Sequence, residues 1–303
     1  MKLFISLFSL LFFTVSYGEE ALVPMSVVEQ NLQDYTDEEK ALIGDDLSNI
    51  DQLIFRNKSP NSNAFYLGTA GGPGSCKSTI LETILQNDPL FQNACYIDPD
   101  PQGLRLMINT YLTRGLSFYT ISQAASFKDA QVKAYNYWRG GSNYIAQTLL
   151  NKAFKGGFNI AHGTTATSPV VEKFYKALKD KSYTITLVLC YATDETRGKT
   201  IQYRTETQAN YQATPEDAIQ KGKMFPERFP VYFQYADSLR LYWTDNFPSG
   251  GSKEVARIEN QTLTIKDPIG YKSFVNQYEE DRKNFSSPGL SWEDLLKIQG
   301  IGS

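Results

Sequence analysis

Short apolar runs alternate with helix-like segments through the middle of the chain. The apolar runs predict β-strands, and several are apolar on both faces, as in strands covered by helices on each side. The expected strands cover residues 64–69, 94–97, 158–161, 183–191 and 239–244, and helical patterns between them cover residues 77–86, 143–154 and 169–180. This alternation predicts an α/β domain with a mainly parallel sheet and helices on both faces.

Polar extensions flank this domain, which we place at residues 64–262. Residues 19–63 form an expected N-terminal helical extension, with one amphipathic helix over residues 37–55. Residues 263–303 form a C-terminal extension with short helices over residues 271–285 and 292–299. The polar, helix-prone stretch 194–234 lies before the last strand, and it is interpreted either as a mobile lid or as a solvated helical surface.

The first 18 residues have the three-part layout of a secretory signal peptide. Lys2 precedes the apolar run 3–15, and Ser16 and Gly18 have the spacing of a cleavage site. The alternative is a membrane anchor, although the run is shorter than the roughly 20 residues that a spanning helix needs. No later stretch could span a bilayer, so we expect a secreted or periplasmic protein without a stable membrane anchor after cleavage.

Composition excludes several classes of function. The chain has 30 basic and 33 acidic residues and a formal charge of −3, which argues against nucleic-acid binding. Its three cysteines are an odd number, and Cys95 and Cys190 lie in buried-strand patterns, so no disulfide framework is expected. With one histidine and no Cys-x-x-Cys spacing, the sequence also predicts no zinc site.

A glycine-rich segment follows the first expected strand and opens a helix. It reads Gly-Gly-Pro-Gly-Ser-Cys-Lys-Ser-Thr over residues 71–79 and matches the phosphate-loop pattern G-x-x-x-x-G-K-[ST], except that Cys76 replaces the second glycine. Backbone N–H groups of such a loop bind phosphates, Lys77 would hold the β- and γ-phosphates of ATP, and the Ser78 hydroxyl would bind Mg²⁺. The expected nucleotide-binding residues are Gly71, Gly72, Gly74, Ser75, Cys76, Lys77, Ser78 and Thr79. The alternative is an ordinary glycine-rich turn with a surface lysine.

Cys76 itself has two interpretations. A thiol beside Lys77 and a helix N-terminus would have a depressed pKa and would be open to oxidation. Alternatively, it is a tolerated small side chain that makes the turn less permissive than glycine would.

Two carboxylates end the second expected strand, in the segment Asp98-Pro-Asp100. Open α/β sheets bind their ligands at this carboxyl edge. Phosphate transfer to a hydroxyl needs a proton acceptor and support for Mg²⁺, so we assign Asp100 as the base and Asp98 to the metal side. The alternative is a turn that begins the next helix.

Several segments together resemble the zeta toxin family, and the similarity spans about residues 65–260. They are Phe65-Tyr-Leu-Gly, Pro73-Gly-Ser-Cys-Lys-Ser, Tyr96-Ile-Asp-Pro-Asp, Phe158-Asn-Ile-Ala-His-Gly-Thr and Ala213-Thr-Pro. The resemblance implies a P-loop kinase that uses ATP and Mg²⁺ to phosphorylate UDP-N-acetylglucosamine, with Asp100 as the base. An inhibitory protein partner is left open.

The chain departs from the family at the acceptor positions. His162 stands where the family has glutamate before Gly-Thr, Ala166 stands for an arginine, and Gln147 stands for a helix glutamate. Gln212 occupies a further arginine position. Because buried polar groups discriminate strongly between substrates, these changes leave the acceptor open. The expected substrate-binding residues are Asp98, Gln147, His162 and Thr164. His162 either lines the acceptor pocket or is merely hydrogen-bonded at a strand end.

A lid cation commonly compensates the charge that develops on the moving phosphoryl group. Arg197, Arg204 and Arg228 are candidates in the stretch 194–234, and Arg204 is the first choice because it lies in its middle.

The leading hypothesis is an ATP-dependent phosphotransferase that acts on a hydroxyl of a small molecule, such as a UDP-N-acetyl sugar. The alternative is a degenerate P-loop protein that binds nucleotide without turnover, and a third hypothesis is an exported structural or adhesive protein. Because the signal peptide directs export while ATP is abundant inside cells, delivery into another cell as an effector or toxin is a further hypothesis.

Overall fold

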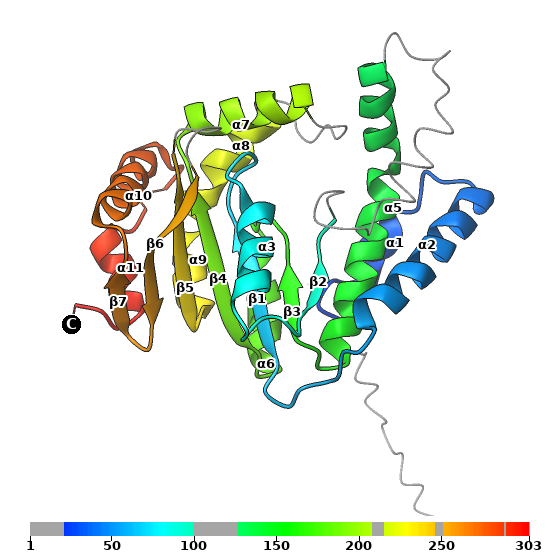
Figure 1. Ribbon diagram of the computed structural model, residues 1–303, viewed down its shortest axis with the longest axis horizontal. Helices are drawn as coiled ribbons and strands as arrows, with labels where there is room; N and C mark the ends of the chain where they lie inside the picture. Colours follow the sequence, from blue (N-terminus) through cyan, green and yellow to red (C-terminus); the bar gives the residue numbers. More distant parts are fainter. Residues whose placement is uncertain (1–20, 100–126, 208–214, 246–250, 288, 303) are drawn as a thin grey trace, which may run out of the picture.

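The computed structural model describes residues 21–99, 127–207, 215–245, 251–287 and 289–302 (Figure 1). The predicted signal peptide, the proposed base Asp100 and Gln212 lie outside the described residues.

A seven-stranded sheet forms the centre of the molecule. Its strands, in spatial order, are β2 (Cys95–Ile97), β3 (Ile160–His162), β1 (Phe65–Ala70), β4 (Thr184–Tyr191), β5 (Ser238–Thr244), β6 (Ser252–Glu259) and β7 (Thr262–Ile265). The first five strands are parallel, while β6 and β7 form an antiparallel hairpin on β5. All five predicted strands are confirmed with ends that shift by one or two residues, and the β6–β7 hairpin was not predicted.

Helices cover both faces of this sheet, as predicted. Side chains of β1 and β4 alternate between the two faces, so that Phe65 and Val188 pack on α3 (Lys77–Asn87). Tyr66 and Leu187 face the opposite core, which contains α6 (Val171–Asp180), α9 (Phe229–Tyr235) and α10 (Pro268–Asp281). In Figure 1, α3 lies on the near side of the sheet and α9 on the far side. The mainly parallel α/β fold is confirmed.

The N-terminal extension packs on one long helix beside β2 (Figure 1). It contains α1 (Met25–Gln30) and α2 (Asp37–Phe55), and the long helix is α5 (Phe127–Lys155). The predicted bounds of α2 are confirmed, and Thr36 and Glu39 form a capping box at its start. By contrast, α1 was not predicted, and α5 begins 16 residues before the expected helix at residue 143.

The stretch 194–234 contains three helices with different roles. They are α7 (Asp194–Thr207), α8 (Pro215–Glu227) and α9. Phe229, Tyr232 and Phe233 of α9 are fully buried and pack with α10 and α11 (Trp292–Ile298). α9 is therefore part of the core, and for this helix the interpretations as a mobile lid and as a solvated surface are both wrong. By contrast, α7 and α8 lie across the end of the sheet nearest the start of α3 (Figure 1).

The C-terminal extension is helical as expected, but the sheet continues into it. β7 begins at residue 262, α10 begins at Pro268, and a short 3-10 helix, η3 (Arg282–Asn284), follows it. Within the described part of the chain, none of the helices combines the length and apolar character needed to cross a bilayer.

Candidate active site

The glycine-rich segment forms a tight loop between β1 and α3. Gly74 has φ +83°, in the left-handed region that favours glycine. A Cβ atom at this position would lie 2.5 Å from the backbone carbonyl oxygen of Arg197 in α7. Gly74 is therefore required both by the turn and by the close packing of the loop on α7.

Lys77 begins α3, and its side chain folds over the loop. Its Nζ donates a hydrogen bond to the carbonyl oxygen of Gly72 at 2.9 Å, and the Ser75 hydroxyl donates to the same oxygen at 2.8 Å. Ser78 and Thr79 lie in the first turn of α3, half-buried and exposed respectively. The N-terminus of α3 and the Lys77 ammonium group thus lie together at this loop, as a phosphate site requires.

Cys76 occupies the position at which the phosphate-loop pattern has glycine. It has φ +60° and ψ 23°, a left-handed conformation that costs a residue with a Cβ atom about 1 kcal/mol. Its thiol is buried in the cluster formed by Ile80, Leu81 and other apolar residues of α3 and the sheet. This burial favours the interpretation as a tolerated small side chain over that as an oxidisable thiol.

We expect the free energy of unfolding of Cys76→Gly to exceed that of Cys76→Ala by about 1 kcal/mol, because glycine adopts the left-handed conformation of the folded state without strain. Cys76→Ala is the matched control, since it removes the sulfur and retains the strained Cβ atom. Urea unfolding of the two variants measures the effect, and equal free energies of unfolding would contradict it.

Arg197 is the arginine of the stretch 194–234 that the structure places against this loop. Its guanidinium donates to the carbonyl oxygens of Ala218 at 2.7 Å and Pro73 at 3.4 Å, and it pairs with Asp194. The side chain is only 5% exposed. Arg197 therefore connects α7, α8 and the loop in one buried contact.

The other two arginines lie elsewhere. Arg204, the first choice from the sequence, lies in the last turn of α7, roughly 10 Å further along the helix axis than Arg197. Arg228 precedes α9, and its Nε donates to the carbonyl oxygen of Thr167 at 3.5 Å, on the β3–α6 loop. Sequence spacing could not show which of the three arginines contacts the phosphate loop, because the burial of Arg197 depends on its packing against α8.

The β3–α6 loop is fastened to the base of the phosphate loop. The Thr69 hydroxyl donates to the carbonyl oxygen of Thr164 at 2.8 Å and accepts from the Thr164 amide at 3.0 Å. The Gly71 amide donates to the carbonyl oxygen of Thr165 at 3.1 Å. These bonds fix the two loops side by side at the carboxyl edge of the sheet.

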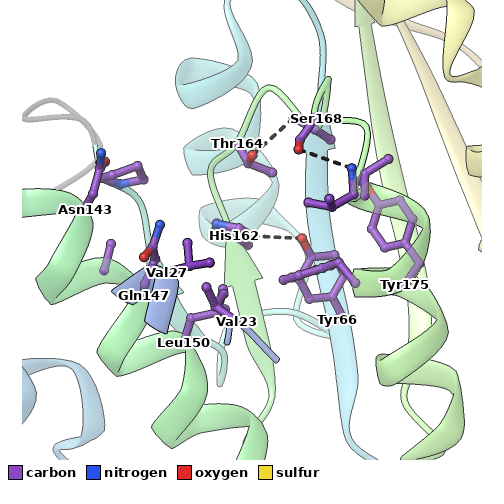
Figure 2. Close-up of a pocket in the computed structure, with 16 residues that line it drawn as sticks. Val23, Val27, Tyr66, Asn143, Gln147, Leu150, His162, Thr164, Ser168 and Tyr175 are labelled. Atoms are coloured by element: carbon purple, nitrogen blue, oxygen red, sulfur yellow. Dashed lines mark hydrogen bonds between the residues drawn. The ribbon is translucent and has the colours of Figure 1, made fainter. Parts of the chain in front are cut away.

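A cavity of about 350 Å³ opens beside the β3–α6 loop (Figure 2). Gln147 on α5, His162 at the end of β3, and Thr164 and Ala166 on the loop line it. The structure thus brings together three of the four expected substrate-binding residues, and three of the positions at which the chain departs from the family, Gln147, His162 and Ala166, line the same cavity. We call this cavity the acceptor pocket.

Asp98, the fourth expected residue, directly follows β2 at this edge of the sheet and is 2% exposed. A Cβ atom at Gly163 would lie 2.0 Å from its Oδ2 atom, and the Tyr96 hydroxyl donates to the same atom at 3.4 Å. The next residue, Pro99, lines the acceptor pocket, and the chain then continues to Asp100 outside the described residues.

His162 is half-buried and pairs with the buried Tyr66, and both line the acceptor pocket. The Tyr66 hydroxyl and His162 Nδ1 are 2.9 Å apart (Figure 2). Burial lowers the pKa of His162 to about 4 and raises the pKa of Tyr66 well above its usual value. Both groups are therefore uncharged at neutral pH.

This burial predicts a specific dependence of stability on pH. Between about pH 6.5 and pH 4 the unfolded chain binds a proton on His162 that the native state does not bind. The free energy of unfolding should therefore decrease as the pH falls through this range, by up to about 1.4 kcal/mol per pH unit. Urea unfolding of wild type and His162→Gln over this range measures the contribution, and parallel curves for the two proteins would contradict it.

The first turn of α3 carries an oxygen ligand of the kind that Mg²⁺ binds. No group of three or more His, Cys, Asp or Glu side chains that could hold a metal occurs in the described ranges. Mg²⁺ in phosphate-transfer sites commonly takes one or two protein oxygens together with phosphates and waters. The Ser78 hydroxyl in the first turn of α3 is of this type and fits such a site.

These features define the class of P-loop phosphotransferases: a parallel sheet in the order β2-β3-β1-β4-β5, with a phosphate loop between the central strand and its helix. The zeta toxin family model matches residues 55–224, more than half of the chain. The chain belongs to the zeta toxin family, as its motifs predicted.

Solved structures show the same fold at low sequence identity. A structure from the PezAT chromosomal toxin-antitoxin system of Streptococcus pneumoniae is 16% identical, with a TM-score of 0.51 over 83% of this chain and 98% of that chain. The AvrRxo1-ORF1:AvrRxo1-ORF2 complex with sulphate ions is 12% identical, with a TM-score of 0.55 over 93% and 95% of the two chains. The same complex with ATP is 12% identical, with a TM-score of 0.51 over 86% and 87%. Comparison with curated protein sequences finds no match.

Proposed function

We propose that this protein transfers the γ-phosphate of ATP to a hydroxyl group of a small molecule. The observation that carries the proposal is that the acceptor-pocket loop is hydrogen-bonded to Thr69 and Gly71, at the point where the phosphate loop begins. Two ligands bound at these sites would be held next to each other, and such positioning supplies much of the rate of phosphate transfer. The ATP present in one structural neighbour supports the choice of nucleotide.

Each part of the site has a role in this reaction. The loop amides and Lys77 hold the β- and γ-phosphates, and the buried Arg197 fixes the loop against α7 and α8. Mg²⁺ would bind at Ser78, with Asp98 as the proposed support on the metal side, and would neutralise phosphate charge.

The chemical step needs one proton acceptor. Asp100, which follows the pocket residue Pro99, accepts the proton of the acceptor hydroxyl, whose oxygen forms the new bond to the γ-phosphorus. The bond between the γ-phosphorus and the oxygen bridging to the β-phosphate breaks, and ADP leaves.

A metabolite screen tests the proposal. The purified chain is incubated with ATP, Mg²⁺ and a small-molecule extract that includes UDP-N-acetylglucosamine, and mass spectrometry detects compounds that gain one phosphate. We expect at least one phosphorylated hydroxyl compound together with an equal amount of ADP. ATP binding without any phosphorylated product would instead support the non-catalytic alternative, for which the strained Cys76 is the favouring observation.

We further propose an inhibitory protein partner and export through residues 1–18. The first is supported by the toxin-antitoxin system of one neighbour, and the second by the layout of the leader. Co-expression with the gene next to that of this protein tests the first proposal, and N-terminal sequencing of secreted protein tests the second.

A further inference from the structure

The acceptor pocket contains no ionised side chain among the described residues that line it. Its walls are mostly apolar, with Leu150 of α5, Val171 and Phe174 of α6, and Ala166 of the loop. Its titratable side chains are Tyr66, Tyr175 and His162, and burial holds all three in their neutral forms at neutral pH. An unpaired ligand charge would lose its hydration here without finding a counter-charge in these walls.

The N-terminal segment 21–31 completes this pocket from outside the region that the family model matches. Val23 and Val27 of this segment line the pocket beside α5 (Figure 2). The segment is fixed in place because Asn151 of α5 accepts from the Val23 amide at 2.8 Å and donates to the Val23 carbonyl oxygen at 2.8 Å.

Asn31, at the end of this segment, determines how Gln147 is oriented. Its Nδ2 donates to the backbone carbonyls of Val27 and Val28 at 3.0 and 3.1 Å and to Gln147 Oε1 at 3.0 Å. Because carbonyl oxygens can only accept, the Asn31 atom must be its amide nitrogen, and Gln147 must present its oxygen to it. In the described part of the chain, the Gln147 NH₂ group has no hydrogen-bond acceptor, and Gln147 points into the same space as His162 (Figure 2).

A glycine in α5 makes this arrangement sterically feasible. A Cβ atom at Gly140 would lie 2.6 Å from the Asn31 carbonyl oxygen. Since this neighbour is backbone, a side chain at residue 140 would displace the segment that carries Asn31. Gly44 of α2 offers a contrast, because a Cβ atom there would have no neighbour within 4 Å.

We propose that the acceptor moiety bound in this pocket is uncharged and largely apolar, and that the N-terminal segment selects it by directing the Gln147 NH₂ group to an accepting oxygen or ring nitrogen. This inference deepens the proposed function, on which it rests, by naming the chemical class of the acceptor.

A charge series of probes tests the substrate class. The compounds are 4-(hydroxymethyl)benzamide, 4-(hydroxymethyl)benzoate and 4-(hydroxymethyl)benzylamine, which share an apolar ring and a hydroxyl but are neutral, anionic and cationic. Ligand-observed NMR with the full chain should show the amide binding at least about tenfold more tightly than either ion. Equal or tighter binding of an ion, or no binding of the amide, overturns the proposal.

Gly140→Ala and the matched Gly44→Ala test the role of the segment. We expect Gly140→Ala to weaken binding of the amide probe at least about fivefold while ATP affinity is unchanged, and Gly44→Ala to change neither. Asn31→Ala should reproduce the loss if Gly140→Ala folds poorly, as judged by its melting temperature. Wild-type probe affinity in either folded variant overturns the role of the segment. Failure of ATP binding in the wild type would instead count against the proposed function, because the probe measurements do not depend on nucleotide.

Discussion

Replacing Lys77 with alanine is expected to lower the rate of phosphate transfer by about 100-fold to 1000-fold. The Lys77 ammonium folds over the phosphate loop at Gly72, where it would neutralise charge that grows on the transferred phosphoryl group. Loss of one preorganised electrostatic contact of this kind costs about 3 to 4 kcal/mol in the transition state. Initial rates of ADP formation with a saturating acceptor measure the change.

The control for this prediction is Lys199→Ala. Lys199 lies on α7, is exposed, and pairs with Glu195 one helical turn away. Such surface pairs contribute little to stability, so this variant should retain wild-type turnover and melting temperature. Wild-type turnover in a Lys77→Ala variant that melts at the same temperature as the control would contradict the prediction. It would show that Lys77 has no part in the chemistry.

Replacing Asp100 with asparagine should have an effect of similar size for a different reason. Asparagine is nearly isosteric but cannot accept the hydroxyl proton, and loss of a general base lowers turnover by about 100-fold to 10,000-fold. Because the substitution leaves the phosphate loop intact, the Kd for ATP should stay within about twofold of the wild-type value. Rapid-quench kinetics of the transfer step and calorimetry with ATP separate the two quantities.

Asp180→Asn is the corresponding control, since Asp180 is exposed at the end of α6 and pairs with Lys176. An unchanged rate of transfer in Asp100→Asn would contradict the assignment of Asp100 as the base. Another carboxylate near the acceptor pocket would then have to accept the proton. A joint loss of transfer and ATP binding would equally reject the assignment, because it would show a structural role.

The sequence predicted the parallel half of the fold because its strands carry strong local signals. β1 and β4 are apolar on both faces, which is typical of strands covered by helices on each side. The phosphate-loop motif after β1 also predicted that a helix, α3, follows this strand. β6 was missed because charged and polar side chains occupy most of its positions. Its few buried apolar side chains are sufficient for a strand that packs on one face only. The four residues of β7 are mostly exposed and gave no apolar run.

The sequence predicted the motif residues of the candidate site, but it did not predict the tertiary contacts that position them. The phosphate loop and the pocket positions Gln147, His162 and Thr164 came from motifs and from the family resemblance. The contact between Asn31 and Gln147 joins residues 116 positions apart, and α1 has only six residues with one buried side chain. No local pattern encodes such a contact, and the selection of Arg197 among three arginines likewise depends on tertiary packing.

The three cysteines have a practical consequence for handling the protein. All are unpaired and buried in the native state, and burial raises the pKa of Cys95 to about 11 and of Cys190 to about 12. Thiols protected in this way exchange slowly, so the folded protein should withstand an oxidising buffer without added reductant. Denaturation exposes all three at once, and an odd number of thiols leaves at least one free to crosslink chains. Refolding from inclusion bodies should therefore succeed under reduction and yield covalent dimers under air.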